Sequence, residues 1–438
     1  MSTAMAKCNF IYEYESISAD DKRKGEKIGE VRYVSSDQFE MLENFILSNI
    51  SEGEDAAEVM RLTSRCGKKY AVACNYVGVI TLADGTNIEI LPKIGKKCRE
   101  SDARRLLVKM LRTLRPVPYK VNQSANIDVE KLPLFEVFVR MFIDEIYAVI
   151  RRGIRCGYER VEENQKFFKG KLLVGRHIMQ NAVHKERFYV EYDEFNANRA
   201  ENKLIKSALL YLHKKSCSFA NQSDLRSLFA VFDEVKPSEN VEQDLMKSCK
   251  ERGTEYYSEA IKWCGVFLAG KSFSMFEGSQ YAKALLFPME KLFESYIAAE
   301  LSRKFLGEYS ISTQEQQRWL FDSPKKFKLR PDIVMRRENL VFILDTKWKL
   351  LNNDPSKNYG ISQADMYQMY AYHKKYEKSG ETHFVKHCVL SYPSMGEDVH
   401  SSISFSALDG VNVSAFFIDL MNVGKSLENL RPLIDNEG

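Results

Sequence analysis

This chain of 438 residues lacks a long uncharged apolar run, a Cys-x-x-Cys pair and a large net charge. Its most apolar long segment, residues 135–150, contains four charged side chains, which excludes a membrane span there and predicts a buried amphipathic helix. The first 21 residues lack the charged-then-apolar pattern of a secretory signal. The nine scattered cysteines favour free thiols in a reducing compartment. We therefore expect a cytoplasmic protein with no membrane segment.

The net charge of only +4 gives little general attraction for nucleic acid, but the basic residues are unevenly distributed. Residues 93–120 contain ten basic and two acidic side chains. We interpret this stretch as a solvated helix face or a protein interface. A second basic cluster stands directly before the acidic motif described below, where phosphate contact is the better interpretation. Its members are Lys325, Lys326, Lys328 and Arg330.

The length suits two or three domains, each with its own core, and the hydropathy pattern predicts a multidomain α/β fold. We expect an N-terminal α/β module over residues 1–125, a mostly helical region over 126–277 and an α/β domain over 278–438. In the first module, a helix over residues 39–50 precedes strands over 69–80 and 87–94, with an Asp84-Gly85 turn between the strands. Helical spacing follows over residues 101–114, 134–151, 201–214, 224–232 and 255–268.

Two apolar segments in the C-terminal third carry acids at their ends. Asp332 follows Pro331 in the first segment, and the second ends in Asp345-Thr346-Lys347. Strand side chains alternate between faces, so Asp345 and Lys347 should point the same way, and strand pairing should bring Asp332 beside them. Two carboxylates and one ammonium suit phosphodiester hydrolysis assisted by Mg²⁺, which prefers hard oxygen ligands.

The elements around these two strands add further polar candidates. Residues 288–305 have the apolar spacing of a helix that begins after a proline, and Glu294 lies on it. Ser362 to Asp365 resembles a capping box that starts a helix carrying Gln368. A strand is expected over residues 384–393. The predicted order is therefore helix, strand pair, helix, strand.

Pro331-Asp332 together with Asp345-Thr346-Lys347 resembles the PD-(D/E)XK nuclease signature, and the predicted order of elements is that of its core. Residues 365–372, Asp-Met-Tyr-Gln-Met-Tyr-Ala-Tyr, resemble the McrC family, the nuclease subunit of McrBC-type restriction systems. Upstream segments resemble the same family over roughly residues 70–395. They are residues 78–80, 84–85, 88–94, 152–154, 158, 168–172, 193–195 and 202–206, with Asn202-Lys203 where members commonly carry Asn-Arg.

The McrC resemblance implies a Mg²⁺-dependent DNA endonuclease subunit with a PD-(D/E)XK domain. Asp332 and Asp345 would bind the metal together with the backbone carbonyl of Thr346. Lys347 would orient the attacking water, and Glu294 would complete the metal shell through a water.

Further expectations concern the surroundings of the site. Gln368 would support it from the facing helix, and the Lys325 to Arg330 cluster would contact DNA. The partner would be a McrB-like AAA+ GTPase hexamer, docked on residues 1–125 and stimulated by this chain. The substrate would be double-stranded DNA, methylated or otherwise modified.

Three other interpretations remain to be weighed. Residues 265–272 match a phosphate-loop pattern, but helical spacing precedes them and the inner positions are apolar, so we expect a helix end. His383 and His387 have the spacing of a zinc pair, but they lie in a predicted strand without a third ligand. A non-catalytic adaptor that binds DNA through a degenerate nuclease fold would not need Asp332, Asp345 and Lys347.

Overall fold

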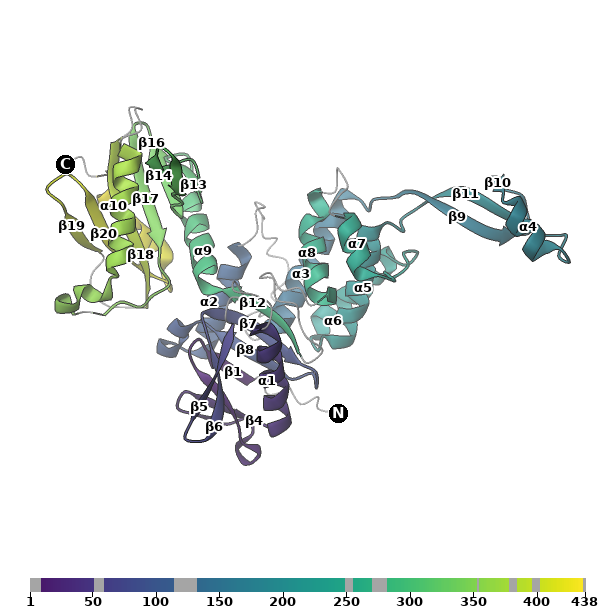
Figure 1. Cartoon of the computed structure of the whole chain (residues 1–438), viewed down its shortest axis with the longest axis horizontal. Helices are drawn as coiled ribbons and strands as arrows, with labels where there is room; N and C mark the ends of the chain where they lie inside the picture. The colour runs from purple at the N-terminus through teal and green to yellow at the C-terminus, as the bar shows by residue number, and fades with distance from the viewer. Residues whose placement is uncertain are drawn as a thin grey trace.

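A computed structural model describes residues 9–50, 59–113, 132–248, 255–269, 282–352, 354–377, 384–395 and 402–435. These residues form an N-terminal module with two sheets, a helical bundle from which a long arm projects, and a C-terminal region around a six-stranded sheet (Figure 1). The mixed multidomain α/β class is therefore confirmed. Over the described ranges, no helix is both long enough and apolar enough to cross a membrane.

The N-terminal module contains a five-stranded sheet in the order β3-β4-β2-β6-β5 and a four-stranded sheet in the order β1-β8-β7-β12. The helix α1 (Ser36–Ile50) packs on strands of both sheets. The helix α2 (Glu100–Thr113) lies against β8. The strands are β1 (Asn9–Tyr12), β2 (Ser16–Ala19), β3 (Lys27–Ile28), β4 (Val31–Val34), β5 (Met60–Arg65), β6 (Lys68–Ala73), β7 (Tyr76–Leu82), β8 (Asn87–Leu91) and β12 (Ala282–Pro288).

The single strand expected over residues 69–80 is wrong, because two strands of different sheets occupy this range. The chain passes from one sheet to the other at Cys74 and Asn75. The Cys74 N–H donates to Val59, next to the β5–β6 pairing, and the Asn75 carbonyl accepts from Met289, next to the β7–β12 pairing. The last strand of the four-stranded sheet, β12, comes from residues that the sequence assigned to the C-terminal domain. Its antiparallel pairing with β7 ties the chain after residue 282 back to the N-terminal module.

The middle region is a helical bundle interrupted by the arm. The bundle comprises α3 (Leu134–Arg152), α5 (Ala200–Lys215), α6 (Phe219–Val231), α7 (Val241–Ser248) and α8 (Ser258–Ala269). The arm comprises β9 (Gly157–Gln165), β10 (Lys171–Leu172), α4 (Val174–Asn181) and β11 (Phe188–Asn196), and it extends far from the rest of the molecule (Figure 1). Because nothing in the described chain covers its far end, large apolar side chains are exposed along it.

The C-terminal region is a sheet in the order β13-β16-β17-β18-β20-β19 with helices on both faces. Asp332 was expected within the first of two strands, but this strand begins one residue later, at Ile333. The turn between the two strands comprises Glu338 and Asn339. The elements are α9 (Met289–Lys304), β13 (Ser310–Thr313), β14 (Trp319–Asp322), β15 (Lys325–Lys328), β16 (Ile333–Arg337), β17 (Leu340–Thr346), α10 (Gln363–Glu377), β18 (Phe384–Ser394), β19 (Ser402–Ser406), β20 (Asn412–Asp419), α11 (Val423–Glu428) and α12 (Arg431–Asp435).

Alternation along β17 divides its side chains between two cores. Phe342 and Leu344 join the core beneath α9, which continues into the helical bundle and the N-terminal sheet. Val341 and Ile343 join a separate core with the α10 residue Met369. Continued alternation turns the following odd-numbered residues, 345 and 347, towards α10. The sheet is thus buried on both faces, and its polar residues collect where β17 ends.

Gly78 has no room for a side chain. It lies in β7 with φ +139°, and an added Cβ would stand 1.9 Å from the backbone oxygen of Leu285 in β12. We predict that Gly78→Ala separates these strands and lowers the free energy of unfolding by about 3 kcal/mol or more. Gly85→Ala is the matched control, because Gly85 also has a positive φ, +86°, but no atom within 4 Å of the added Cβ. It should cost only about 1 kcal/mol.

Thermal unfolding of the full chain measures both variants. Equal losses for Gly78→Ala and Gly85→Ala would mean that backbone conformation alone, and not the contact with β12, makes glycine necessary at position 78.

Candidate active site

The β16–β17 pair brings Asp332 next to the end of the neighbouring strand. Ile333 pairs with Leu344, so Asp332 stands beside the residues that follow Leu344. The Oδ2 atom of Asp332 accepts hydrogen bonds from the backbone N–H of Thr346 at 2.7 Å and from its Oγ1 at 2.8 Å. One carboxylate oxygen is thereby held in place, while Oδ1 remains directed to other groups.

Lys347 lies within an acidic and amide environment on the α10 side of the sheet. Its Nζ is 2.6 Å from Asp345 Oδ2 and 3.8 Å from Asp365 Oδ1, and it donates to Gln368 Oε1 at 3.2 Å. Burial lowers the pKa of Lys347, but the charge of Asp345 more than offsets this, so the pKa is raised overall. The ammonium therefore stays protonated at neutral pH.

Glu294 approaches the same place from α9, and Gln314 connects it to Asp332. The Nε2 atom of Gln314 donates to Glu294 Oε1 at 2.5 Å and to Asp332 Oδ1 at 3.3 Å. Gln314 has φ +50°, an uncommon value for a residue other than glycine, and such strain concentrates at functional sites. Sequence reasoning missed Gln314, because it belongs to no motif and only the pairing of β13 with β16 brings it here.

Burial and mutual repulsion raise the pKa of two of the acids. Burial, and then the charge of Asp332, raise the pKa of Asp345 to about 6. Burial and Asp332 likewise raise the pKa of Glu294 to about 7. Carboxylates that disfavour each other's ionisation would be stabilised by a cation between them.

The helix α10 supplies a supporting chain of hydrogen bonds. Gln368 Nε2 donates to the hydroxyl of Tyr372 at 2.7 Å, and that hydroxyl donates to the carbonyl of Arg330 at 3.0 Å. The segment before Asp332 is thus connected to the residue that contacts Lys347. Asp365 was not assigned a role from sequence, although it stands three positions before Gln368 and therefore on the same helix face.

Trp348 fixes the residue after Lys347 against the N-terminal module. Its Nε1 lies 3.1 and 3.0 Å from the two carboxylate oxygens of Glu13, which is fully buried. Glu13 also accepts from the backbone N–H of Lys93 at 2.8 Å, and Lys93 Nζ donates to the Trp348 carbonyl at 2.9 Å. On its other side, the Trp348 ring contacts Phe293, the neighbour of Glu294. The N-terminal module therefore contacts the residue that follows Lys347, and that residue in turn packs on α9.

The two basic stretches differ in their surroundings. In the first, Lys96 pairs with Glu30 at 2.6 Å and Arg104 with the buried Glu89 at 2.6 Å, so much of its charge is compensated inside the molecule. Residues 114–120 and the Lys97 side chain lie outside the described part. In the second, the side chains are exposed and follow the β14–β15 hairpin towards Asp332. These are Lys325, Lys326, Lys328 and Arg330.

The two rival motifs have ordinary surroundings where they are described. Residues 265–269 form the end of the helix α8, as expected, whereas Gly270, Lys271 and Ser272 lie outside the described residues. His387 Nε2 is 2.6 Å from Ser414 Oγ on the neighbouring strand, and His383 is not described.

The donor set suits a hard cation only in part. Where the chain is described, no three His, Cys, Asp or Glu side chains converge closely enough to hold a metal by themselves. Asp345 is instead drawn to Lys347. Mg²⁺, however, commonly takes one or two carboxylates and fills its shell with water. Nearby, the buried hydroxyl of Tyr392 has no hydrogen-bond partner among the described residues, and its pKa is raised by burial and by Asp365 and Asp345. The residues therefore fit a Mg²⁺ ion that keeps several waters.

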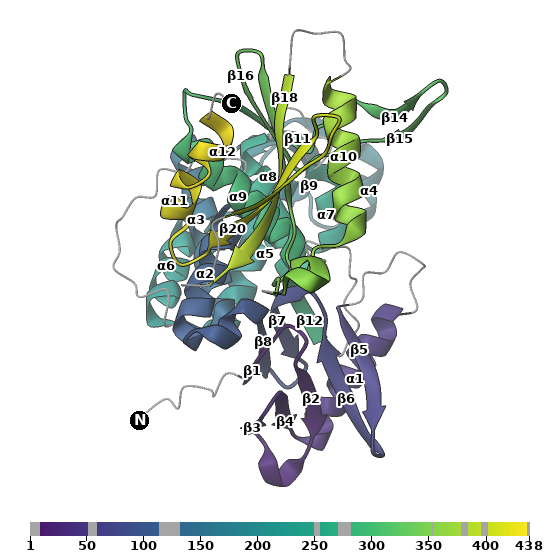
Figure 2. The same cartoon turned by 90° about the vertical axis from the view of Figure 1, so that its left-hand side faces the viewer.

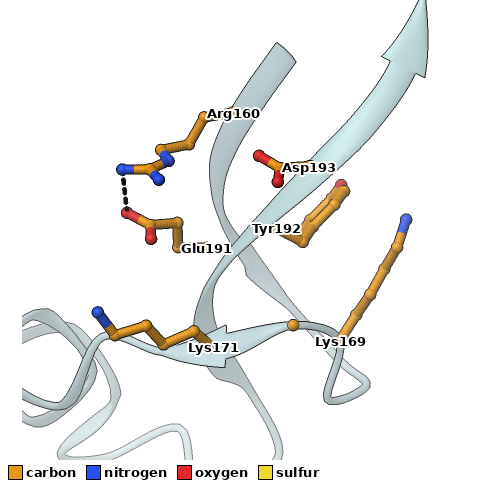
Figure 3. A pocket seen from close by; sticks show the side chains of 7 residues that line it. Arg160, Lys169, Lys171, Glu191, Tyr192 and Asp193 are labelled. Carbon is orange, nitrogen blue, oxygen red and sulfur yellow. Dashed lines mark ion pairs between the residues drawn. The ribbon is translucent and has the colours of Figure 1, made fainter. Parts of the chain in front are cut away.

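A cavity of about 520 Å³ lies elsewhere, on the arm (Figure 3). Lys169, Lys171 and the ion pair of Arg160 with Glu191 surround it, together with Tyr192 and Asp193. The cavity is open to solvent, and its mixed charges differ from the acidic cluster at the end of β17.

Comparisons with known proteins give a family and two similar solved structures. The family model described as "McrBC 5-methylcytosine restriction system component" matches residues 72–393. A chain in the half-complex of Thermococcus gammatolerans McrB AAA+ hexamers with bound McrC is similar, with 20% identity and a TM-score of 0.62, over 96% of this chain and 99% of that one. A chain in the cryo-EM structure of the Thermococcus gammatolerans McrBC complex has 20% identity and a TM-score of 0.45, over 72% and 90%. No curated protein sequence matches.

The fold is that of a multidomain α/β protein with a polar site at one end of a mixed sheet. Because the family model covers well over half of the sequence, the chain belongs to the family of McrBC 5-methylcytosine restriction system components. The first structural similarity shows that the fold is shared along nearly the whole length.

The raised pKa values predict that Mg²⁺ stabilises this protein more at high pH than at low pH. The folded pKa of Asp345, about 6, and that of Glu294, about 7, exceed their ordinary values of 3.8 and 4.5. Their contribution to stability is therefore full below about pH 4 and is lost as the pH rises through 6 to 7. Mg²⁺ competes with the same protons, so it should raise the midpoint of thermal unfolding more at about pH 8 than at about pH 5.

Asp345→Asn should fold normally, and the effect of Mg²⁺ on its unfolding midpoint should differ much less between the two pH values. An equal effect of Mg²⁺ at both pH values, or an undiminished effect in Asp345→Asn, would contradict metal binding at these acids.

Proposed function

We propose that this chain is the Mg²⁺-dependent endonuclease subunit of a McrBC-like restriction complex, and that it cuts phosphodiester bonds of double-stranded DNA at a PD-(D/E)XK site. The observation that carries this proposal is the convergence of Asp332, Asp345 and Lys347 at the end of β17. Family membership supports it independently.

The substrate of this reaction is double-stranded DNA, methylated or otherwise modified. In the site, Asp332 and Asp345 would hold Mg²⁺ with the Thr346 carbonyl, and Glu294 would reach it through a water. The bound ion would supply Lewis-acid polarisation of the scissile phosphate. Asp332 Oδ1 is the oxygen available for this role, because Oδ2 is held by Thr346.

Lys347 provides the positive charge that the reaction needs beside the phosphate. Its ammonium orients the attacking water and stabilises the negative charge that develops on the phosphate oxygens. Gln368 keeps the ammonium on the α10 side through its 3.2 Å contact. The exposed cluster of Lys325, Lys326, Lys328 and Arg330 holds the DNA backbone close to the acids, which alone would repel it.

The partner in this proposal is a McrB-like AAA+ GTPase hexamer in the cytoplasm, whose GTP hydrolysis this chain stimulates. The similar solved chain belongs to an assembly of McrB AAA+ hexamers with bound McrC, which supports such a partner. Residues 1–125 remain one candidate docking surface, including the Asp84-Gly85 turn. The arm is a second candidate, because exposed apolar side chains gather on it as they do on protein-binding surfaces. These include Tyr158, Phe167, Phe168, Val174, Ile178, Met179, Val183 and Phe195.

We expect Lys347→Ala to reduce the rate of DNA cleavage by about a hundredfold to a thousandfold, because it removes the cation that stabilises the transition state. Asp345→Ala should abolish cleavage by removing a metal ligand. Both variants should still bind the GTPase and stimulate its hydrolysis. Cleavage by the mixed purified subunits is the measurement, with GTP turnover as the control for folding.

Full cleavage by both variants would remove the Asp-Thr-Lys motif from the mechanism. Stimulation of the GTPase without cleavage by the unmodified chain would favour the alternative, a non-catalytic adaptor that binds DNA through a degenerate nuclease fold.

The docking surfaces can be separated by charged substitutions at exposed positions. Met179→Asp at the arm should weaken stimulation of the GTPase, because it places a charge in an apolar contact. Leu408→Asp is the matched control, since Leu408 is also fully exposed but lies in the C-terminal region. Loss of stimulation by Asp84→Ala alone, with Met179→Asp unaffected, would instead assign docking to the N-terminal module.

A further inference from the structure

The β14–β15 hairpin stands apart from the large sheet and has two different faces. Phe321 pairs with Lys326, and Trp319 with Lys328. On the inner face, Leu320 packs into the core beneath α10, and Asp322 accepts from Lys375 of that helix at 2.7 Å. In Figure 2 the hairpin extends beyond α10, away from the body of the protein.

The outer face combines aromatic rings with lysines. Phe321 and Phe327 are 54% and 71% exposed, and their ring centroids are 5.9 Å apart in an edge-to-face arrangement. Lys328 Nζ lies 5.5 Å from the Trp319 ring. Lys326, opposite Phe321, forms no ion pair with a carboxylate in the described chain, whereas Lys325 stands opposite Asp322 of the inner face. Apolar rings and uncompensated charge therefore share one open surface.

Phe327 adopts a conformation that its own side chain disfavours. Its φ of +56° lies in the left-handed region, which is strained for a residue with a Cβ and not for glycine. This backbone turns the Phe327 ring to the side of Phe321. A strained position that exposes a large ring gains nothing for folding, and such positions concentrate at ligand contacts.

The base of the hairpin is connected to the candidate active site. Leu329 N–H donates to the Arg318 carbonyl at 2.9 Å, which closes the hairpin. The next residue, Arg330, accepts from Tyr372, which in turn accepts from Gln368 beside Lys347. A ligand on the outer face would therefore contact the strand β15, which is joined to Asp332 by residues 329–331.

We propose that this outer face binds an unpaired base of the DNA strand next to the scissile phosphate. Phe321 and Phe327 stack on the base, and Lys326 and Lys328, which stand opposite Phe321 and Trp319, hold the adjoining phosphates. Exposed aromatic rings among cations are the general means of holding single-stranded nucleic acid, because every base has a stacking face. In a duplex that face is covered by its neighbours. The proposal rests on the proposed nuclease function and extends it to the form of DNA at the site.

A protein occupant fits this surface less well. Lysine is depleted from protein interfaces, whereas aromatic residues are enriched. The two lysines of this face, Lys326 and Lys328, therefore favour a polyanion.

The test uses the full chain without divalent metal, so that no strand is cut. The probe is a single strand of about 12 nucleotides that carries 2-aminopurine, whose fluorescence falls on stacking, compared with a duplex of the same sequence. Phe321→Leu and Phe327→Leu should each weaken single-strand binding by about fivefold to tenfold and reduce the quenching. Phe321→Tyr and Phe327→Tyr, the matched controls, keep the rings and should bind normally.

Phe327→Gly separates a ligand-binding role from a structural one. Glycine adopts this φ without strain, so the midpoint of thermal unfolding should stay the same or rise while single-strand affinity falls. A fall in stability together with unchanged affinity would overturn the proposal.

Other results would overturn it as well. One is normal single-strand binding and quenching by both leucine variants. Another is an equal loss for the duplex and the single strand, which would mean contact with the backbone alone. A third is unchanged DNA affinity with reduced stimulation of the GTPase, which would assign the face to a protein. Cleavage by the unmodified chain is measured separately with Mg²⁺, so failure of the nuclease proposal is recognised independently of the stacking result.

Discussion

The buried contact between Glu13 and Trp348 is the interaction on which the placement of the site depends. Glu13 belongs to the N-terminal module, and Trp348 directly follows the lysine at the end of β17. Because the carboxyl group is fully buried, breaking this contact would remove the indole donor that lies close to both of its oxygens, which makes the join costly to open. Together with the pairing of β12 to β7, it couples the N-terminal module to the residues that surround Lys347.

The site itself balances burial against charge. Asp332 is held by Thr346, whereas Asp345 and Glu294 are disfavoured as anions by burial and by Asp332. Such an arrangement lowers the stability of the protein when no cation is bound, but it favours the binding of a cation. Many functional sites lower stability in this way. The strained residue Gln314 belongs to the same pattern, since it presents its side chain to Glu294 and Asp332 at a cost to the backbone.

Sequence reasoning succeeded where patterns are local. The helices at α1, α3 and α9 follow from apolar spacing, and the alternation along β17 correctly put Asp345 and Lys347 on one side. It failed where the chain turns for tertiary reasons. Residues 69–80 are predicted as one strand because both strands in this range are apolar. The strand β12 could not be assigned to the N-terminal sheet because its partner β7 lies about two hundred residues earlier.

The sequence by itself determined which acids and which lysine form the motif and the order in which they occur. This was possible because the hydrophobic alternation and the proline before Asp332 are features of consecutive residues. Only the tertiary structure decided which other side chains join them. Gln314, Asp365 and Glu13 come to the site or its surroundings through strand pairing, helix packing and the contact with Trp348, none of which is a contact between neighbouring residues. The physical reason is that local patterns fix the face on which a side chain lies, whereas long-range packing fixes what it meets there.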